Sequence, residues 1–119
     1  MNWEFELVAG PYGGTTEGPV WTGSSVLFTD IQGSRIMRYI PDTGEVEEYF
    51  TGTSNTNGLC FDSGGNLYGC QQAGRRIVRF EADQRTISSL PHTLDQIPHN
   101  NPNDLVVDRS GRIWFTDPY

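Results

Sequence analysis

Short apolar runs separated by turn residues recur along the chain and predict an all-β structure. Val26–Asp30 and Arg76–Phe80 are such runs, and Pro41–Gly44 has the Pro-Asp-Thr-Gly sequence of a tight turn. No window shows the 3.6-residue periodicity of an amphipathic helix. The pattern therefore predicts about ten short strands and essentially no helix.

Three segments can be superimposed, and each opens with an oxygen-bearing side chain. Glu17 and Asn57 lie 40 residues apart, and Asn57 and Asn103 lie 46 residues apart. A repeat of about 40 residues, built of short strands, is typical of a β-propeller. Each opening residue would then begin the innermost strand of a blade and point toward one central axis. The second strands are aligned as Leu27–Asp30, Leu67–Cys70 and Trp114–Asp117.

The repeats predict one incomplete β-propeller domain over residues 1–119. We assign residues 17–50 to a first blade, 57–90 to a second blade and 103–119 to half of a third. Residues 1–16 would hold one strand of a closing blade, Trp3–Val8, and a loop. At about 40 residues per blade the chain holds about two and a half blades. We therefore expect either a fragment of a longer protein or an assembly of several chains.

The net charge and the hydropathy of the chain argue against two classes of partner, nucleic acids and membranes. The formal net charge is −7, and an acidic chain repels phosphate backbones, so no nucleic-acid partner is expected. No apolar run reaches the ~18 residues of a membrane span, so no membrane partner is expected. The N-terminus lacks a signal-peptide pattern, and we expect a cytoplasmic protein.

The two cysteines lie on the arms of one predicted hairpin. A cross-strand disulfide between Cys60 and Cys70 is geometrically conceivable. Nothing indicates an oxidising compartment, however, so we expect two buried thiols. Two cysteines are too few for a structural zinc site without further ligands.

Several motifs recur in a characteristic order and spacing: Glu17–Trp21 with Leu27–Asp30, Asn57–Leu59, Arg75–Arg79, and Asn100–Asp104 through Phe115–Tyr119. Together they resemble the SMP-30/gluconolactonase/LRE-like family, and its gluconolactonase branch in particular. The resemblance covers nearly the whole chain and is weakest over Gln84–His99. It implies a six-bladed propeller of roughly twice this length or more, of which this chain would be the N-terminal part.

The resemblance also implies one divalent cation at the bottom of the axial cleft. Glu17 occupies the position of a glutamate that binds this cation, and Asn103 matches an asparagine that contacts substrate or metal. The remaining Asn and Asp ligands would lie beyond residue 119. Carboxylate and amide oxygens suit hard cations, so Ca²⁺ is the first expectation, and Mg²⁺, Mn²⁺ and Zn²⁺ are alternatives.

Further polar residues are candidates for substrate contacts. Asn57 is one of them, although Asn57-Gly58 is also a common turn dipeptide. Gln71 and Gln72 follow a second strand and could reach substrate hydroxyls. Asn103 is both a substrate and a metal candidate, against the alternative of an Asx turn that caps the strand.

Other polar residues are assigned to structure. Asp30 and Asp117 end second strands, where loop capping is favoured over a role in the site. Asp104 receives little weight as a cleft residue. His92 and His99 lie in a polar connection, where a solvated histidine is the more common case, and no catalytic residue is assigned.

These observations predict a metal-dependent hydrolase that opens sugar lactones in its complete form, with a small-molecule lactone as partner. A variant of this prediction keeps the metal site and replaces the lactone substrate with phosphotriesters or other esters. The alternative is a non-catalytic propeller fragment that acts as a structural or oligomerising module. Unpaired strand edges at Trp3–Val8 and Trp114–Thr116 favour self-association or pairing with missing C-terminal blades.

Overall fold

The computed structural model describes residues 1–91 and 93–118, and this part of the chain forms strands and no helix. The first four-stranded antiparallel sheet contains β1 (Thr16–Trp21), β2 (Val26–Asp30), β3 (Arg35–Ile40) and β4 (Glu45–Thr51) in sequence order. The second contains β5 (Thr56–Phe61), β6 (Leu67–Gln71), β7 (Arg76–Phe80) and β8 (Ile87–Ser89). Two-stranded sheets contain β9 (Thr93–Leu94) with β10 (Ile97–Pro98), and β11 (Leu105–Val107) with β12 (Ile113–Phe115).

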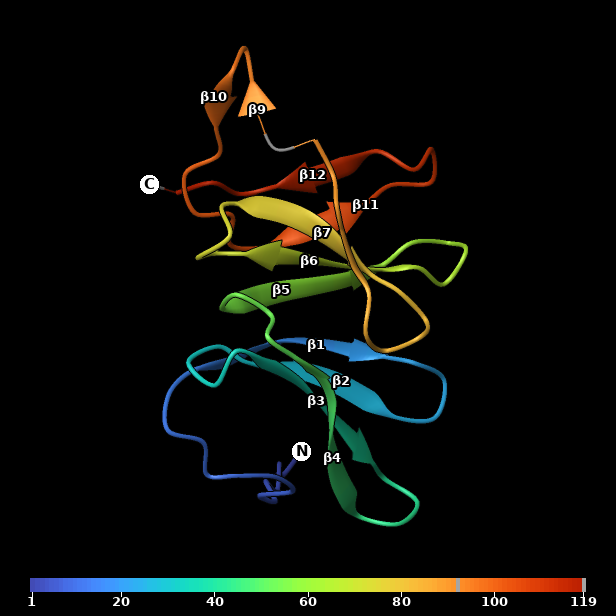
Figure 1. Cartoon of the computed structure of the whole chain (residues 1–119). Helices are drawn as coiled ribbons and strands as arrows, with labels where there is room; N and C mark the ends of the chain where they lie inside the picture. Colours follow the sequence, from blue (N-terminus) through green and yellow to red (C-terminus); the bar gives the residue numbers. More distant parts are fainter. Residues whose placement is uncertain (92, 119) are drawn as a thin grey trace.

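The sheets stack in chain order as propeller blades do, with β1, β5 and β11 side by side at the inner edge (Figure 1). The predicted all-β propeller fold is thereby confirmed. Strands β2 and β7 begin and end where the sequence predicts. None of the described residues forms a helix with the length and apolarity that crossing a membrane needs.

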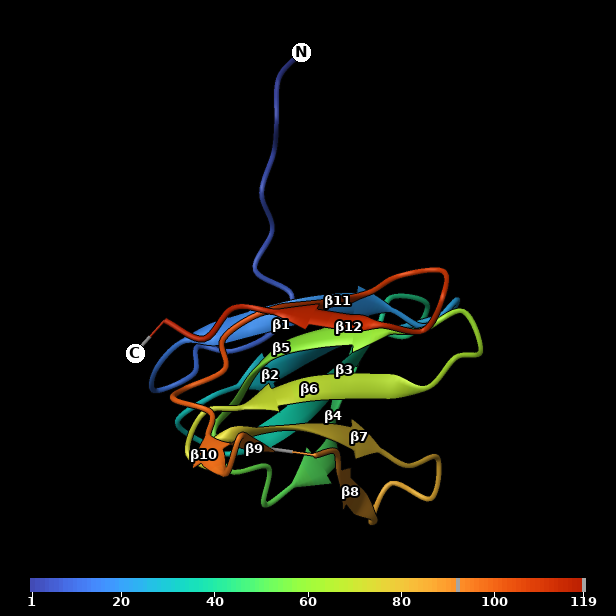
Figure 2. The same cartoon turned by 90° about the horizontal axis from the view of Figure 1, so that it is seen from above.

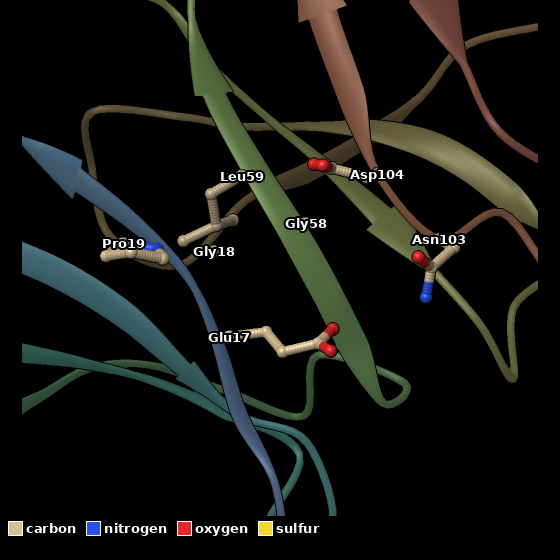
Figure 3. Close-up of a pocket in the computed structure, with 7 residues that line it drawn as sticks. All are labelled: Glu17, Gly18, Pro19, Gly58, Leu59, Asn103 and Asp104. Carbon is tan, nitrogen blue, oxygen red and sulfur yellow. The ribbon is translucent and has the colours of Figure 1, made fainter.

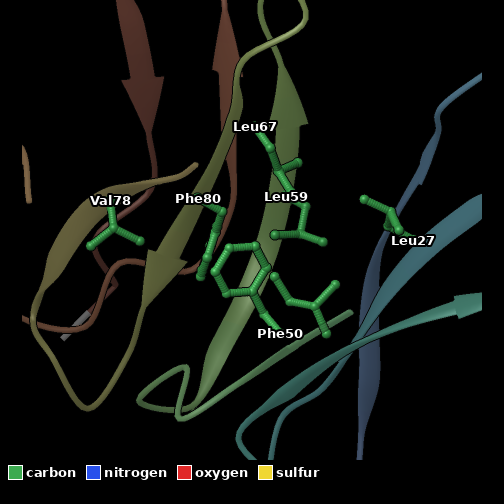
Figure 4. Packing of buried hydrophobic residues seen from close by; sticks show 7 residues of the cluster. Leu27, Phe50, Leu59, Leu67, Val78 and Phe80 are labelled. Atoms are coloured by element: carbon green, nitrogen blue, oxygen red, sulfur yellow. The ribbon is translucent and has the colours of Figure 1, made fainter. Parts of the chain in front are cut away.

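A hydrophobic core fills the space between the two four-stranded sheets. Phe50 of the first sheet and Phe80 of the second pack edge to face, with ring centroids 4.9 Å apart. Such aromatic pairs add stability beyond the area that they bury. The core contains Leu27, Ile36, Phe50, Leu59, Leu67, Val78 and Phe80 (Figure 4). This packing fixes the first two inner strands relative to one another.

A second cluster joins the second sheet to the β11–β12 pair. Cys70 and Ile77 of the second sheet pack there against Leu105 of β11. Both cysteines are free thiols, as expected, but only Cys70 is buried and Cys60 is half-buried.

The alignment of the second repeat with the first was wrong by one residue in its second strand. Thr29 pairs with Ile36, and the corresponding pair in the second sheet is Cys70 with Ile77. Cys70 therefore corresponds to Thr29 and not to Asp30. The cause is the turn between the first two strands, which spans residues 22–25 in the first sheet and 62–66 in the second.

The predicted strand at Trp3–Val8 is absent from the structure. Trp3 and Phe5 are 76% and 94% exposed, and the segment extends away from the sheets (Figure 2). A strand needs a neighbour to accept its backbone hydrogen bonds, and no described strand lies beside this segment. Its membership of a closing blade stays a prediction.

The connection after the second sheet contains a hairpin that the sequence did not reveal. Strands β9 and β10 pair around Asp95 and Gln96, which both have positive φ angles, 51° and 68°. Two consecutive positive φ angles are the mark of a type I′ hairpin turn.

Candidate functional site

A hollow of about 370 Å³ opens where the three inner strands begin (Figure 3). Glu17 from β1 and Asn103, just before β11, lie on opposite sides of Gly58 in β5. The hollow is lined by Glu17, Gly18, Pro19, Gly58, Leu59, Asn103 and Asp104. Two of the predicted site residues, far apart in the sequence, are thus brought together.

Glycines allow the inner strands to approach closely at this point. A Cβ atom on Gly18 would lie 2.5 Å from the carbonyl oxygen of Asn57, and one on Gly58 would lie 2.8 Å from that of Asn103. Gly18 also has a φ angle of +58°, which disfavours most side chains. The pairing of β1 with β2 shifts register between Glu17 and Val20, as a bulge does. The residue pairs Glu17-Gly18 and Asn57-Gly58 therefore set the spacing of the site.

Hydrogen bonds connect the strand openings in series. The Thr29 hydroxyl lies within hydrogen-bond distance of the carbonyl oxygens of Glu17 (3.0 Å) and Asn57 (2.9 Å). The Gly58 amide donates to the carbonyl oxygen of Asn103 at 3.0 Å. The Asn103 amide in turn donates to Thr116 at 2.9 Å. This series holds the backbone at all three openings in one arrangement.

Three polar side chains line the hollow, and only that of Asp104 forms a hydrogen bond with another described residue. Glu17, Asn103 and Asp104 are all exposed. One Asp104 carboxylate oxygen accepts the Leu105 amide at 2.9 Å. Neither Glu17 nor Asp104 forms an ion pair with another described residue. Two carboxylates and one amide therefore line the hollow without a protein cation, and one of them belongs to Asp104, which received little weight from the sequence.

Asn57 and Gln71 are buried and do not line the hollow. Asn57 is 2% exposed, and its side-chain oxygen accepts the amide of Gly58 at 2.9 Å. Gln71 is also buried, and its side-chain oxygen accepts a hydrogen bond from the Arg76 guanidinium at 2.7 Å. Only the backbone next to Asn57 reaches the hollow. Gln72 lies elsewhere, in a neighbouring groove with Asn55 and other loop residues.

The two strand-end aspartates cap loops. Asp30 accepts the Arg35 guanidinium at 2.8 Å and the Gly33 amide at 3.3 Å. Asp117 accepts the amides of Asn100 at 2.9 Å and Asn101 at 2.7 Å. Both contacts agree with the predicted structural role.

The two histidines were left out of the predicted site. The His99 ring packs edge to face against Phe115, with ring centroids 4.9 Å apart. His92 lies outside the described residues.

Cys70 is not a nucleophile in this environment. Burial, with a smaller contribution from the Asp104 and Asp117 carboxylates, raises the pKa of the Cys70 thiol to about 12. A thiol with such a pKa stays protonated at neutral pH, and the thiolate is the reactive form. The described residues contain no group of three or more His, Cys, Asp or Glu side chains that could hold a metal ion. A cation in the hollow would therefore need amide oxygens or ligands from outside this chain.

The stacked four-stranded sheets, with a polar hollow where their inner strands begin, define a β-propeller protein. The family model for the SMP-30/Gluconolactonase/LRE-like region matches residues 15–119. The chain belongs to this family.

Two gluconolactonases are among the similar proteins. The gluconolactonase of Zymomonas mobilis is 27% identical, and the match covers 87% of this chain and 33% of that protein. The solved gluconolactonase from Xanthomonas campestris is 35% identical with a TM-score of 0.80, covering 87% of this chain and 34% of that one. The calcium-binding protein regucalcin from Agrobacterium tumefaciens, at 18% identity and a TM-score of 0.66, shares the fold, over 85% of this chain and 37% of that one. The chain spans about a third of the length of the gluconolactonases that it matches.

Proposed function

We propose that the hollow belongs to a metal-dependent lactonase that opens sugar lactones when the other parts of the propeller are present. The observation that carries the proposal is the meeting of Glu17 and Asn103 at one hollow, from segments far apart in the sequence. The family and the two gluconolactonase relatives support the reaction class.

The donor set of the hollow fits a hard divalent cation. Glu17 offers a carboxylate and Asn103 a neutral amide oxygen, which are ligands that Ca²⁺ accepts readily and Mg²⁺, Mn²⁺ or Zn²⁺ also accept. A bound cation would polarise the lactone carbonyl and lower the pKa of a water molecule. The calcium-binding relative with the same fold supports Ca²⁺ as the first candidate.

The residues of this chain would bind and orient the substrate. The side-chain amide of Asn103 can donate a hydrogen bond to a lactone oxygen, and the Asp104 carboxylate can accept one from a sugar hydroxyl. Substrate contacts by Asn57 and Gln72 stay predictions. The burial of Asn57 supports a positioning role for its side chain, since it holds the amide of Gly58.

The test is lactone hydrolysis by the 119-residue chain and by a chimera completed with the later blades of the Xanthomonas gluconolactonase. Gluconolactone would be assayed with Ca²⁺, Mn²⁺ or Zn²⁺ added to metal-free protein. We expect little activity from the short chain, because Glu17 and Asn103 supply too few donors to hold a divalent cation tightly. We expect metal-dependent activity from the chimera. A chimera that turns over equally fast in excess chelator would overturn the proposal.

A second candidate function, a self-associating module, rests on the exposed face of β11 and β12. Val106 and Trp114 are 55% and 57% exposed, and they line an apolar hollow with Leu105 and Phe115. Exposed apolar strand pairs favour pairing with another chain. Sedimentation of the wild type and of Trp114→Lys would test this, with a concentration-dependent mass expected only for the wild type. If the wild type and Trp114→Lys had the same mass at every concentration, a self-associating module would be excluded.

A further inference from the structure

A second groove lies beside the axial hollow, among the loops that connect the strands. It has a volume of about 280 Å³ and is lined by Ile31, Gln32, Asn55, Gln72, Ala73 and Asn101. The turns after β2 and β6 and the segment before β5 gather at the same edge of the sheets as the beginning of β1 (Figure 1). Its lining shares no residue with the hollow at Glu17.

Gln32 is held in one orientation. Its side-chain oxygen accepts the Thr15 amide at 2.7 Å, and the Ile31 amide donates to the Thr15 carbonyl oxygen at 3.1 Å. The Thr15 amide thereby uses one of the two acceptor sites of the Gln32 carboxamide oxygen. The side-chain NH₂ is a hydrogen-bond donor that the Thr15 contact leaves available.

The Gln32 carboxamide is held by its oxygen, whereas the Asn55 carboxamide is held by its NH₂ group. Its side-chain NH₂ donates to the Ile31 carbonyl oxygen at 2.9 Å, and its backbone amide donates to the Ser34 hydroxyl at 3.1 Å. The side-chain oxygen remains as an acceptor. Gln32 and Asn55 thus supply a fixed donor and a fixed acceptor on one groove.

Gln72 and Asn101 add two carboxamides whose side chains form no hydrogen bond with another described residue. Their backbones are anchored. The backbone amide of Gln72 donates to the backbone carbonyl oxygen of Asn55 at 3.4 Å, and the backbone amide of Asn101 donates to the Asp117 carboxylate at 2.7 Å. Each side chain therefore offers both a donor and an acceptor near a fixed position.

The groove carries no charge, because none of its six lining residues is ionisable. Ile31 and Ala73 give it apolar surface between the carboxamides. A hydroxyl group both donates and accepts a hydrogen bond, so neighbouring hydroxyls on a ring would match this alternation of donors and acceptors. A neutral ligand loses no charge solvation when it enters such a groove.

We propose that the groove binds a neutral polyhydroxylated ring, such as a sugar, at a site separate from the axial hollow. Gln32 donates to one hydroxyl, Asn55 accepts from another, and Gln72 and Asn101 complete the contacts. The proposal goes beyond lactone opening and would stand if that activity were absent.

The test is an NMR titration of the ¹⁵N-labelled 119-residue chain with methyl β-D-glucoside, which is neutral and contains no lactone. We expect saturable shifts in the side-chain NH₂ signals of Gln32, Asn55, Gln72 and Asn101. Gln72→Ala and Asn101→Ala should each weaken binding by about two- to tenfold, the usual effect of losing one hydrogen bond. Gln84→Ala, an exposed glutamine in the turn between β7 and β8, is the matched control and should bind as the wild type does.

Two comparisons separate this site from the axial hollow. Glu17→Gln should leave glucoside binding unchanged, whereas it should impair the proposed lactonase. The anion gluconate should bind no more tightly than the glucoside, because no cation lines the groove. Shifts that do not saturate, shifts confined to Glu17 and Asn103, or equal affinity in Gln72→Ala, Asn101→Ala and wild type would each overturn the proposal.

Discussion

The Thr29 hydroxyl lies 2.9 Å from the backbone carbonyl oxygen of Asn57, although the two residues belong to different four-stranded sheets. Both residues are buried. The corresponding position in β6 is occupied by Cys70, which packs against Leu105. At this position in the repeat, the side chain makes a polar contact with the next sheet in the first sheet and an apolar contact in the second.

Replacing Thr29 with valine should destabilise the chain by about 1–3 kcal/mol, because it leaves a buried carbonyl oxygen without its partner. The shape of the side chain is kept, so little of this loss comes from packing. Urea unfolding followed by circular dichroism measures it.

Thr53→Val is the matched control for this substitution. The Thr53 hydroxyl is buried and has no hydrogen-bond partner among the described residues. Its removal should therefore leave the unfolding midpoint unchanged or raise it. Equal losses in Thr29→Val and Thr53→Val would show that the contact between the sheets contributes nothing.

Gly58→Ala should lower the melting temperature, because the added Cβ would lie 2.8 Å from the Asn103 carbonyl oxygen. The backbone of β5 would have to move away from the segment before β11, at a cost of about 1–3 kcal/mol by analogy with overpacked cores. Calorimetry of Gly58→Ala beside Gly13→Ala measures the difference. A Cβ on Gly13 meets nothing within 4 Å, so this control should melt as the wild type does.

In the completed chimera, a substitution of Glu17 should affect metal binding, and a substitution of Asn57 should affect stability. Glu17→Gln should abolish most of the Ca²⁺ affinity and the turnover and leave the melting temperature of the metal-free protein unchanged, since the Glu17 side chain is exposed. Asn57→Ala should lower that melting temperature, since it removes a buried hydrogen bond to Gly58 of about 0.5–1.5 kcal/mol. Calcium titration and thermal melts on both variants measure the two effects. If Glu17→Gln left both the Ca²⁺ affinity and the lactone turnover unchanged, Glu17 would not be a metal ligand.

Stability should fall in acid because hydrogen bonds hold several aspartates in their charged form. The Trp114 indole and the Arg112 amide lower the pKa of Asp108, and the Asn66 side chain and amide lower that of Asp62. A pKa lowered by folding gives stability that is present above the unfolded-state value of about 3.9 and is lost as the pH falls through the folded-state value. Melting temperatures should therefore stay level from about pH 7 to 5 and fall below about pH 4.

Asp108→Asn should show a shallower fall of the melting temperature between about pH 5 and 3 than the wild type, because asparagine does not titrate. Asp42→Asn, at an exposed turn position, serves as the control. Identical acid profiles in Asp108→Asn and wild type would contradict the assignment.

The sequence was sufficient where a segment carries its own signal. The apolar run at Val26–Asp30 and the turn at Pro41–Gly44 predict a strand and a strand boundary without knowledge of their neighbours. The meeting of Glu17 and Asn103 could also be predicted, because both positions follow from the repeat.

Tertiary context decided the rest. Trp3–Val8 has the alternation of a strand, but a strand also needs a partner. Asn57 looks like a turn residue beside Gly58, and only the packing of β5 between two other inner strands explains its burial. The groove of Gln32 and Asn55 depends on which end of each carboxamide meets the backbone, and no sequence pattern specifies that.

The turn at residues 62–66 is one residue longer than its counterpart at 22–25, and it lies at the opposite end of β5 from the strand opening (Figure 1). Length changes there leave the strand openings in place, so this end of a blade can accumulate insertions while the end at the hollow keeps its geometry. A peptide tag or a fluorescent label could be inserted between Gly64 and Gly65 to report on the hollow without disturbing it.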